Sequence, residues 1–323
     1  MEKLNTLRQA IIYFSDFENC KNLMVQLRWP DGVVKCPYCG SDKVAYLANS
    51  RVWKCYTGHP KPTFSLKTGT VFEDSHLGLD KWLPALWLIV NCKNGISSCE
   101  LARDLGVTQK TAWFIGHRLR FALKEGGFGK LSGEVEADET FIGGKARFMH
   151  KDKRAKKITG TGGKEKIAVV GLLERHGEGK NSRVHTEVVP SVRRKTLSPI
   201  VRQQVAEGSE IFTDALKSYD DLDDTYIHQV IDHAEKYVEG NVHTNGLENF
   251  WSLLKRGLSG TYVSVEPFHL FRYLDEQSFR YNNRKGMGDA DRFTLALSQI
   301  TGKRLTYGHL TGKDDGSQPP MAH

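Results

Sequence analysis

Three acidic residues stand where their carboxylates could hold a divalent metal ion. Asp138 and Asp214 lie near the ends of two strand-like segments, and Glu248 follows on a segment with helical spacing. Mg²⁺ is a hard ion that prefers oxygen ligands. Two such ions about 3.5–4 Å apart can activate an attacking oxygen and stabilise the leaving oxygen of a phosphodiester. We therefore predict that these three carboxylates are metal ligands and catalytic residues.

Segment 243–257 must then form a helix with Glu248 at the edge of its buried face. At 100° per residue, its apolar side chains fall on one stripe and a polar group lies beside them. The apolar stripe is Leu247, Phe250, Trp251 and Leu254, and the polar group is Glu248, Ser252 and Lys255. A structural alternative is a capping box, in which Asn245 is the N-cap and Glu248 reaches back to the free backbone N–H groups.

Several neighbours of these acids are open alternatives. Glu134, Glu136 and Glu139 surround Asp138 and could serve as ligands, but we expect Glu139 to form a structural salt bridge. His228, His233 and His243 could approach the third carboxylate, although solvated or structurally satisfied histidines are the commoner case.

A second metal site is indicated by cysteine spacing. Cys36-Pro-Tyr-Cys39 is followed after fifteen residues by Cys55, and His59 stands four residues further on. Three thiolates and one imidazole can close a tetrahedral site around one structural Zn²⁺. His59 is the unusual member, because zinc ribbons commonly repeat Cys-x-x-Cys. A ribbon this small would take part of its folding free energy from the metal.

Segment 96–124 has the pattern of a helix-turn-helix. Ser97 or Ser98 can cap a first helix, Gly106 supplies the turn, and Thr108 caps a second helix that ends near residue 124. In such motifs the second helix enters the major groove. The predicted DNA contacts are Gln109, Lys110, His117, Arg118 and Arg120. The alternative is an ordinary helical hairpin.

Positive charge is concentrated in one segment. The chain carries a net +8, and residues 145–166 hold nine lysines and arginines against two acids, a local balance of +7. Phosphate contact favours such a composition, whereas a solvated charged insertion is the structural alternative. The predicted DNA contacts are Lys153, Arg154, Lys156 and Lys157 in this insertion, and Lys255 and Arg256 after Glu248.

Composition limits the cellular setting. Six cysteines in 323 residues are too few for a disulfide scaffold. No charged and apolar leader opens the sequence, and the longest apolar run, 83–90, is too short for a membrane span. We expect a protein of the reducing cytoplasm with no membrane association.

Strand and helix patterns predict a multidomain α/β protein. Strands are expected at 134–142, 166–173, 183–189, 209–213 and 226–230, with a helix at 195–206 before the last two and the Glu248 helix after them. This order is consistent with a ribonuclease-H-like domain. The expected domains are N-terminal helices and a zinc ribbon (1–75), a helix-turn-helix module (76–127), a catalytic domain with the basic insertion (128–288) and a mobile tail (289–323).

Residues 23–284 resemble the prokaryotic insertion-sequence transposases of the Merlin-like, ISXO-type group. The resemblance rests on Cys36-Pro-Tyr-Cys39, Gly69-Thr-Val-Phe-Glu73, Asp138-Glu-Thr-Phe-Ile-Gly-Gly144, Asp214 and His243-Thr-Asn-Gly-Leu-Glu-Asn-Phe-Trp-Ser-Leu-Leu-Lys-Arg-Gly257. It implies two DNA-reading modules, namely the zinc ribbon and the helix-turn-helix, and a DDE catalytic domain. Members can carry Asn in place of the last acid, so Asn245 and Asn249 are alternatives to Glu248.

The resemblance also implies the cofactors and partners. Two Mg²⁺ or Mn²⁺ ions would be held by Asp138, Asp214 and Glu248. The partners would be double-stranded DNA, as element terminal inverted repeats and target, and further copies of the chain in a dimer or larger assembly at the bacterial nucleoid. The leading expectation is therefore an enzyme that cleaves and joins DNA. The alternatives are a catalytically silent DNA-binding protein and a ribonuclease-H-like nuclease without strand transfer.

Overall fold

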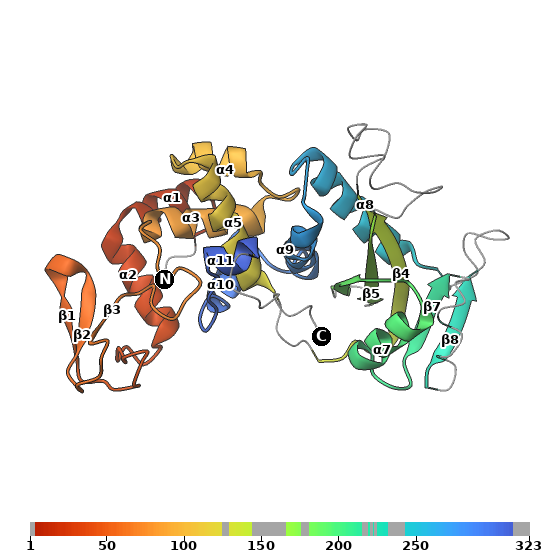
Figure 1. Cartoon of the computed structure of the whole chain (residues 1–323), viewed down its shortest axis with the longest axis horizontal. Coiled ribbons are helices and arrows are strands. Elements are labelled where there is room, and N and C mark those ends of the chain that lie inside the picture. The colour runs from red at the N-terminus through yellow and green to blue at the C-terminus, as the bar shows by residue number, and fades with distance from the viewer. Residues whose placement is uncertain are drawn as a thin grey trace. The chain divides into compact units, whose positions relative to one another are not determined.

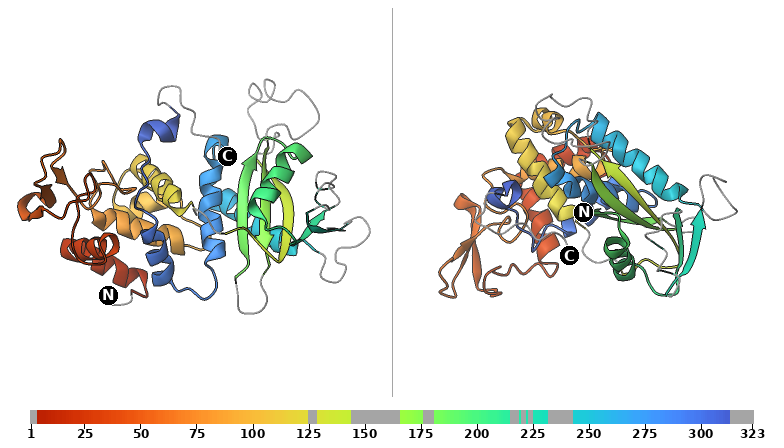
Figure 2. Two further views of the ribbon diagram at one scale, coloured as in Figure 1. Left: turned by 90° about the horizontal axis from the view of Figure 1, so that it is seen from below. Right: turned by 45° about the vertical axis from the view of Figure 1, so that its right-hand side comes forward.

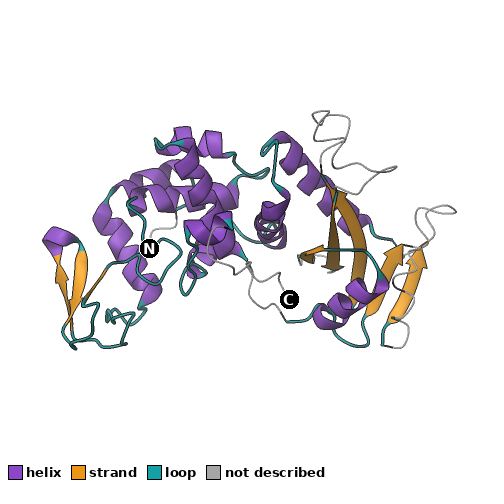
Figure 3. Ribbon diagram, viewed as in Figure 1, coloured by secondary structure: helices purple, strands orange, loops and turns teal. Residues whose placement is uncertain are grey.

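The computed structural model describes residues 4–124, 129–143, 166–175, 181–214, 219, 222, 225–231 and 243–312, with the backbone alone at Asp214 and Ile231. The chain divides into two compact units, unit 1 (residues 1–124 and 287–323) and unit 2 (residues 125–286). Figure 3 shows that helices dominate unit 1, apart from one small sheet, whereas unit 2 combines a larger sheet with helices. Within the described ranges, no helix is both long and apolar enough to cross a bilayer.

Unit 1 begins with two helices and a small antiparallel sheet of order β1-β2-β3. The elements are α1 (Leu7–Ser15), α2 (Phe17–Arg28), β1 (Val44–Leu47), the short 3-10 helix η1 (Ala48–Ser50), β2 (Val52–Cys55) and β3 (Thr63–Phe64). Trp53 of β2 lies against Tyr46 of β1 and Phe64 of β3, with ring centroids 4.7 and 6.0 Å away. Such a sheet buries few side chains.

The remaining helices of unit 1 come from both ends of the chain. They are α3 (Leu79–Asn91), α4 (Ser98–Leu105), α5 (Gln109–Leu123), α10 (Asp289–Ser298) and α11 (Tyr307–Thr311). Phe293 of α10 is buried and packs against Phe14 of α1 and Trp87 of α3. Residues 289–312 therefore complete the helical core of unit 1 and do not form the mobile tail expected from the sequence. Residues 313–323 lie outside the described residues.

The hairpin of α4 and α5 has the predicted turn chemistry. Ser97 accepts a hydrogen bond from the Glu100 backbone N–H, and Thr108 accepts one from Thr111, at 3.1 and 3.2 Å. Gly106 lies between the helices with φ of 63°, a left-handed conformation that glycine adopts without a Cβ penalty. Two capped helices thus meet at the expected glycine turn.

Unit 2 is built on a five-stranded mixed sheet of order β6-β5-β4-β7-β8 (Figure 1). The strands are β4 (Glu134–Ile142), β5 (Ile167–Glu174), β6 (Arg183–Val189), β7 (Glu210–Asp214) and β8 (Ile227–Ile231). β4, β5 and β6 are antiparallel neighbours, whereas β7 and β8 run parallel to β4. This order and these directions are those of a ribonuclease-H-like sheet, as predicted.

Helices cover both faces of this sheet (Figures 1 and 2). They are α7 (Arg194–Gln204) on one face, and α8 (Asn245–Gly260) and α9 (Leu270–Asn282), preceded by the 3-10 turn η4 (Pro267–His269), on the other. Because strand side chains alternate, Val170 and Leu172 of β5 pack in the α7 core while Val169 and Leu173 pack in the α8 core. Residues 144–165, which include nearly all of the predicted basic insertion, lie outside the described residues.

Candidate active site and zinc centre

Asp138 of β4 and Glu248 of α8 line one cavity of about 460 Å³. The other lining residues are Glu139, Thr140, Trp251, Ser252 and Lys255. Glu248, Ser252 and Lys255 thus lie together at the edge of the buried stripe of α8, as helical periodicity predicts. The structure brings the first and third predicted carboxylates to the same opening.

Asp138 is held by two hydrogen bonds at the cavity. Its Oδ1 accepts from the backbone N–H of Glu139 at 2.8 Å, and its Oδ2 accepts from the indole Nε1–H of Trp251 at 2.9 Å. An ionised carboxylate offers about four lone-pair sites. The carboxylate is therefore oriented while lone pairs on both oxygens are still available to a ligand.

The backbone of Asp214 lies level with Asp138 on the neighbouring strand. β4 and β7 pair in parallel, with Glu134 opposite Glu210 and Glu136 opposite Phe212, an offset of 76 residues. The same offset carries 138 to 214, the last residue of β7. The register therefore brings the backbone position of the second predicted acid next to the first.

Glu248 is not part of a capping box. The N-cap of α8 is Thr244, which makes no side-chain capping bond, and Asn245 is the first helical residue. Glu248 is exposed, and no hydrogen bond to its carboxylate is seen within the described part of the chain. The structural alternative for Glu248 is thus removed.

Close contact between α8 and the sheet depends on a missing side chain at Gly171, the cross-strand partner of Asp138. A Cβ there would lie 2.5 Å from the Trp251 ring and 2.9 Å from Leu247. Gly171→Ala is expected to lower the free energy of unfolding by about 1–3 kcal/mol through overpacking, as measured by urea denaturation. Gly260→Ala, where a Cβ would meet nothing within 4 Å, is the matched control. Equal stability of the two variants would contradict the close-packing argument.

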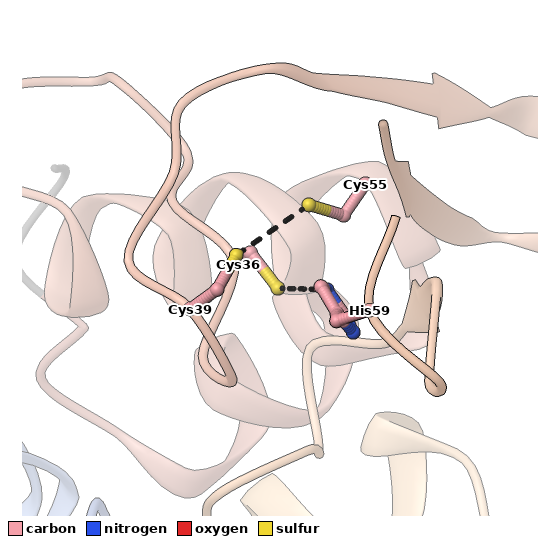
Figure 4. Close-up of side chains that lie close together, drawn as sticks. All are labelled: Cys36, Cys39, Cys55 and His59. Atoms are coloured by element: carbon pink, nitrogen blue, oxygen red, sulfur yellow. Dashed lines mark hydrogen bonds between the residues drawn. The ribbon is translucent and has the colours of Figure 1, made fainter. Parts of the chain in front are cut away.

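The second metal centre lies in the ribbon of unit 1 (Figure 4). The ligand atoms of Cys36, Cys39, Cys55 and His59 all lie within 4.8 Å of one another. Cys36 Sγ is 3.2 Å from His59 Nε2, and the thiols of Cys39 and Cys55 are 3.7 Å apart. Three sulfurs and one imidazole at these separations fit a tetrahedral structural Zn²⁺. The least typical of the predicted ligands, His59, therefore lies within the cluster.

The thiol of Cys39 is the most exposed of the three. The hydrogen bond from Thr57, followed by that of the Ser41 backbone, lowers the pKa of Cys39 to about 7. The thiolate is the form that binds metal, and here it is accessible near neutral pH.

The predicted DNA contacts on α5 divide into exposed and buried sets. Gln109 and Lys110 are exposed at the helix start. Arg118 is 2% exposed, donates to the Glu73 carbonyl and has its pKa lowered to about 10 by burial. Arg120 is buried over Gly116. The assignment of Arg118 and Arg120 as DNA contacts is therefore corrected, because both side chains pack inside unit 1; His117 is buried as well.

Other sequence candidates are placed as follows. Lys255 and Arg256 are exposed on α8, whereas Lys153, Arg154, Lys156 and Lys157 lie outside the described residues. His228 lies 2.8 Å from the Thr213 hydroxyl, and Glu139 accepts a hydrogen bond from the buried Tyr219 hydroxyl. His233 lies outside the described residues.

Sequence analysis missed the residues that support the site. Glu136 is 1% exposed and accepts hydrogen bonds from Arg175 and from the backbone of Leu247. His243 contacts the same arginine through Nδ1 at 2.8 Å. The presence of Glu136 on the same strand face as Asp138, two residues away, was the available signal, but its partners are 39 and 111 residues distant in sequence.

A ribonuclease-H-like sheet with carboxylates beside its central strand, in one chain with a Cys₃His zinc ribbon, defines a two-module class of metal-dependent proteins. Residues 130–282 match the family described as ISXO2-like transposase domain, and residues 15–57 match the transposase zinc-ribbon domain. The chain belongs to the ISXO2-like transposase family. Membership implies transposase activity and a DNA partner.

Two relatives support this membership. The chain is 32% identical over 248 residues to an uncharacterized protein in transposable element ISH50 of Halobacterium salinarum, which covers 74% of this chain and 82% of that protein. It is 38% identical over 102 residues to an uncharacterized transposase-like protein of Haemophilus influenzae, which covers 31% of this chain and 82% of the relative.

Proposed function

We propose that this chain binds the ends of an insertion element and catalyses divalent-metal-dependent DNA cleavage and strand transfer with Asp138, Asp214 and Glu248. The observation that carries the proposal is the cavity shared by Asp138 and Glu248, together with the strand register that sets position 214 level with 138. Each of the three acids comes from a different element. Only the folded sheet and helix α8 can bring such residues together.

The donor set suits two Mg²⁺ or Mn²⁺ ions, since carboxylate oxygens are the ligands that these hard cations prefer. When bound, such ions activate an attacking oxygen and stabilise the leaving oxygen of a phosphodiester. Asp138 contributes an oriented carboxylate, because Trp251 and the Glu139 backbone fix both of its oxygens. Glu248 contributes an exposed carboxylate from the opposite wall.

The reaction proceeds by two displacements at phosphorus. In the first, water attacks the phosphodiester at the element end, the bond to the 3′ oxygen breaks, and a 3′-hydroxyl leaves. In the second, that hydroxyl attacks a target phosphodiester, loses its proton and displaces a new 3′ oxygen. Lys255, at the cavity edge, is placed to contact a DNA phosphate.

DNA would be held by several surfaces. The proposed contacts are Gln109 and Lys110 of α5, Lys255 and Arg256 of α8, and the basic insertion 145–166. The zinc ribbon is a further candidate for reading the element ends. We propose a dimer or larger assembly on DNA, because two element ends must be cut and joined together.

The insertion is expected to act on phosphates and not on bases, since its charge is spread over a segment with little apolar content. Replacing Lys153, Arg154, Lys156 and Lys157 by Ala should weaken binding to all DNA sequences. The slope of log binding constant against log salt should fall by up to about 3.6, at about 0.9 per phosphate contact. Binding titrations at several salt concentrations measure it.

The control for this prediction keeps the charge. Replacing the three lysines of this set by arginine should preserve the slope, because the number of neutralised phosphates is unchanged. A slope unaffected by the alanine changes would show that the insertion does not contact DNA.

The function itself is tested with the full-length protein and DNA that carries the inverted repeats flanking its coding region. Mg²⁺-dependent exposure of 3′-hydroxyls at those ends, followed by joining to plasmid DNA, is the expected result. Specific binding without cleavage would favour the silent DNA-binding alternative. Cleavage without joining would favour a nuclease.

A further inference from the structure

The first turn of α8 is capped by a side chain from the sheet and not by its own sequence. The first four N–H groups of a helix have no intrahelical partner. Thr244, the N-cap, offers no side-chain bond, but the backbone N–H of Leu247 donates to Glu136 Oε2 of β4 at 2.8 Å. A carboxylate at this position also suits the positive end of the helix dipole.

The other oxygen of Glu136 is held by an arginine. Arg175 Nε donates to Glu136 Oε1 at 2.6 Å, and Arg175 also donates to the His243 backbone carbonyl. The guanidinium lies over the Phe212 ring of β7, 4.3 Å from its centroid. One arginine at the end of β5 thus links β4, β7 and the residue that leads into α8.

Space around the Glu136 carboxylate is limited. Glu136 is 1% exposed, and a Cβ on Gly246 would lie 2.8 and 3.0 Å from its two oxygens. Both oxygens accept hydrogen bonds from N–H donors, so this acid is filled by protein partners. These contacts exclude it as the alternative metal ligand considered from the sequence.

The clamp lies next to both carboxylates of the cavity. Glu136 precedes Asp138 by two residues on β4, and alternation places both on the face covered by α8. Leu247, whose N–H is bound, immediately precedes Glu248. The bond between Glu136 and Leu247 therefore joins the two elements that carry Asp138 and Glu248, within two residues of each acid.

We propose that Glu136, held by Arg175, is a positioning residue that sets the separation of Asp138 and Glu248 by capping α8 from the sheet. The inference rests on the proposed function, because the separation matters only if these acids hold metal ions together. Mg²⁺ demands near-ideal octahedral geometry. A small shift of α8 would therefore impair the reaction in Mg²⁺ before it affects folding or DNA binding.

The test uses full-length Glu136→Gln protein. The amide keeps the size of the side chain but turns a donor toward either Leu247 or Arg175, so one hydrogen bond is lost. Two results are expected: faster hydrogen exchange at the first-turn amides of α8, and a fall of about 10- to 100-fold in Mg²⁺-dependent joining, the range found for groups that support metal ligands. Mn²⁺, which takes the same oxygen ligands with less strict geometry, should restore part of the joining, while DNA affinity stays unchanged.

Glu174→Gln is the matched control. Glu174 is 3% exposed and pairs with Arg183 on the neighbouring strand, so the change disturbs a comparable buried carboxylate and arginine in the same sheet. It is not in contact with the first turn of α8 in any printed hydrogen bond or ion pair between described residues. The control should lose stability without faster exchange in α8 and without a difference between Mg²⁺ and Mn²⁺.

Gly246→Ala tests the same geometry if Glu136→Gln fails to fold, because its Cβ displaces the carboxylate without removing the charge. Wild-type joining rates in Mg²⁺ for both variants, or the same metal response in Glu174→Gln, would overturn the positioning role. Absence of metal-dependent joining by the wild-type protein would instead overturn the proposed function. The exchange measurement on α8 is independent of that outcome.

Discussion

Glu248→Gln is expected to reduce Mg²⁺-dependent joining of an element end to plasmid DNA by at least about 100-fold, since even groups that only support metal ligands cost 10- to 100-fold. The change removes a negative charge from a hard-cation site but keeps the shape of the side chain. Glu248 is exposed and is neither the N-cap nor a capping-box partner of α8. Thermal unfolding and DNA binding should therefore be unchanged.

The control is Glu266→Gln, a change at another exposed glutamate of unit 2, which does not line the cavity. It should join DNA at the wild-type rate. Near-normal joining by Glu248→Gln would remove this residue from the triad and direct attention to Asn249 or Asn245, which are exposed on the same helix. Asn245→Ala should cost little stability, because Thr244 and not Asn245 is the N-cap.

The second large effect concerns the zinc ribbon. Cys39→Ser should unfold residues 31–64 locally, because structural zinc contributes binding free energy on the order of 10 kcal/mol to small modules. The ribbon sheet has strands of only four, four and two residues, with Trp53 and Phe64 as its buried side chains. Cys39 itself is exposed, so the loss would come from the metal and not from core packing.

Zinc stoichiometry and hydrogen exchange of the ribbon measure this effect in the full-length protein. Cys99→Ser is the control, since Cys99 is also exposed but lies outside the ligand cluster. Unit 2 should keep its exchange protection in both variants. Wild-type protein without stoichiometric zinc, or a ribbon that stays protected in Cys39→Ser, would contradict a structural metal.

The sequence alone determined the elements and the ligand sets, because these depend on local patterns. Residues 183–189 were predicted as a strand with the bounds that β6 has, and the other predicted strands of the sheet agree within one residue at either end. Alternation and helical periodicity also indicated which residues of α8 are buried. Cysteine spacing specified the ribbon ligands, since a metal knuckle is formed by neighbours in the chain.

Tertiary structure decided which polar residues are free for chemistry. Glu136 and Glu248 are both acids beside apolar patterns, but only the folded sheet brings Arg175 and the α8 backbone to Glu136 and leaves Glu248 exposed. Arg118 is buried by contacts with Glu73 and with Trp82 of α3. Burial depends on partners tens of residues away, which no local pattern specifies.

The same reason explains the C-terminal region. Segment 289–298 has a short amphipathic pattern, but its partners Phe14 and Trp87 lie about two hundred residues or more earlier in the chain. Sequence determined that a helix could form there and that Phe293 could be buried. Only the tertiary structure decided that this helix returns to unit 1, because hydrophobic burial is non-directional and the partner is chosen by the packing of the whole chain.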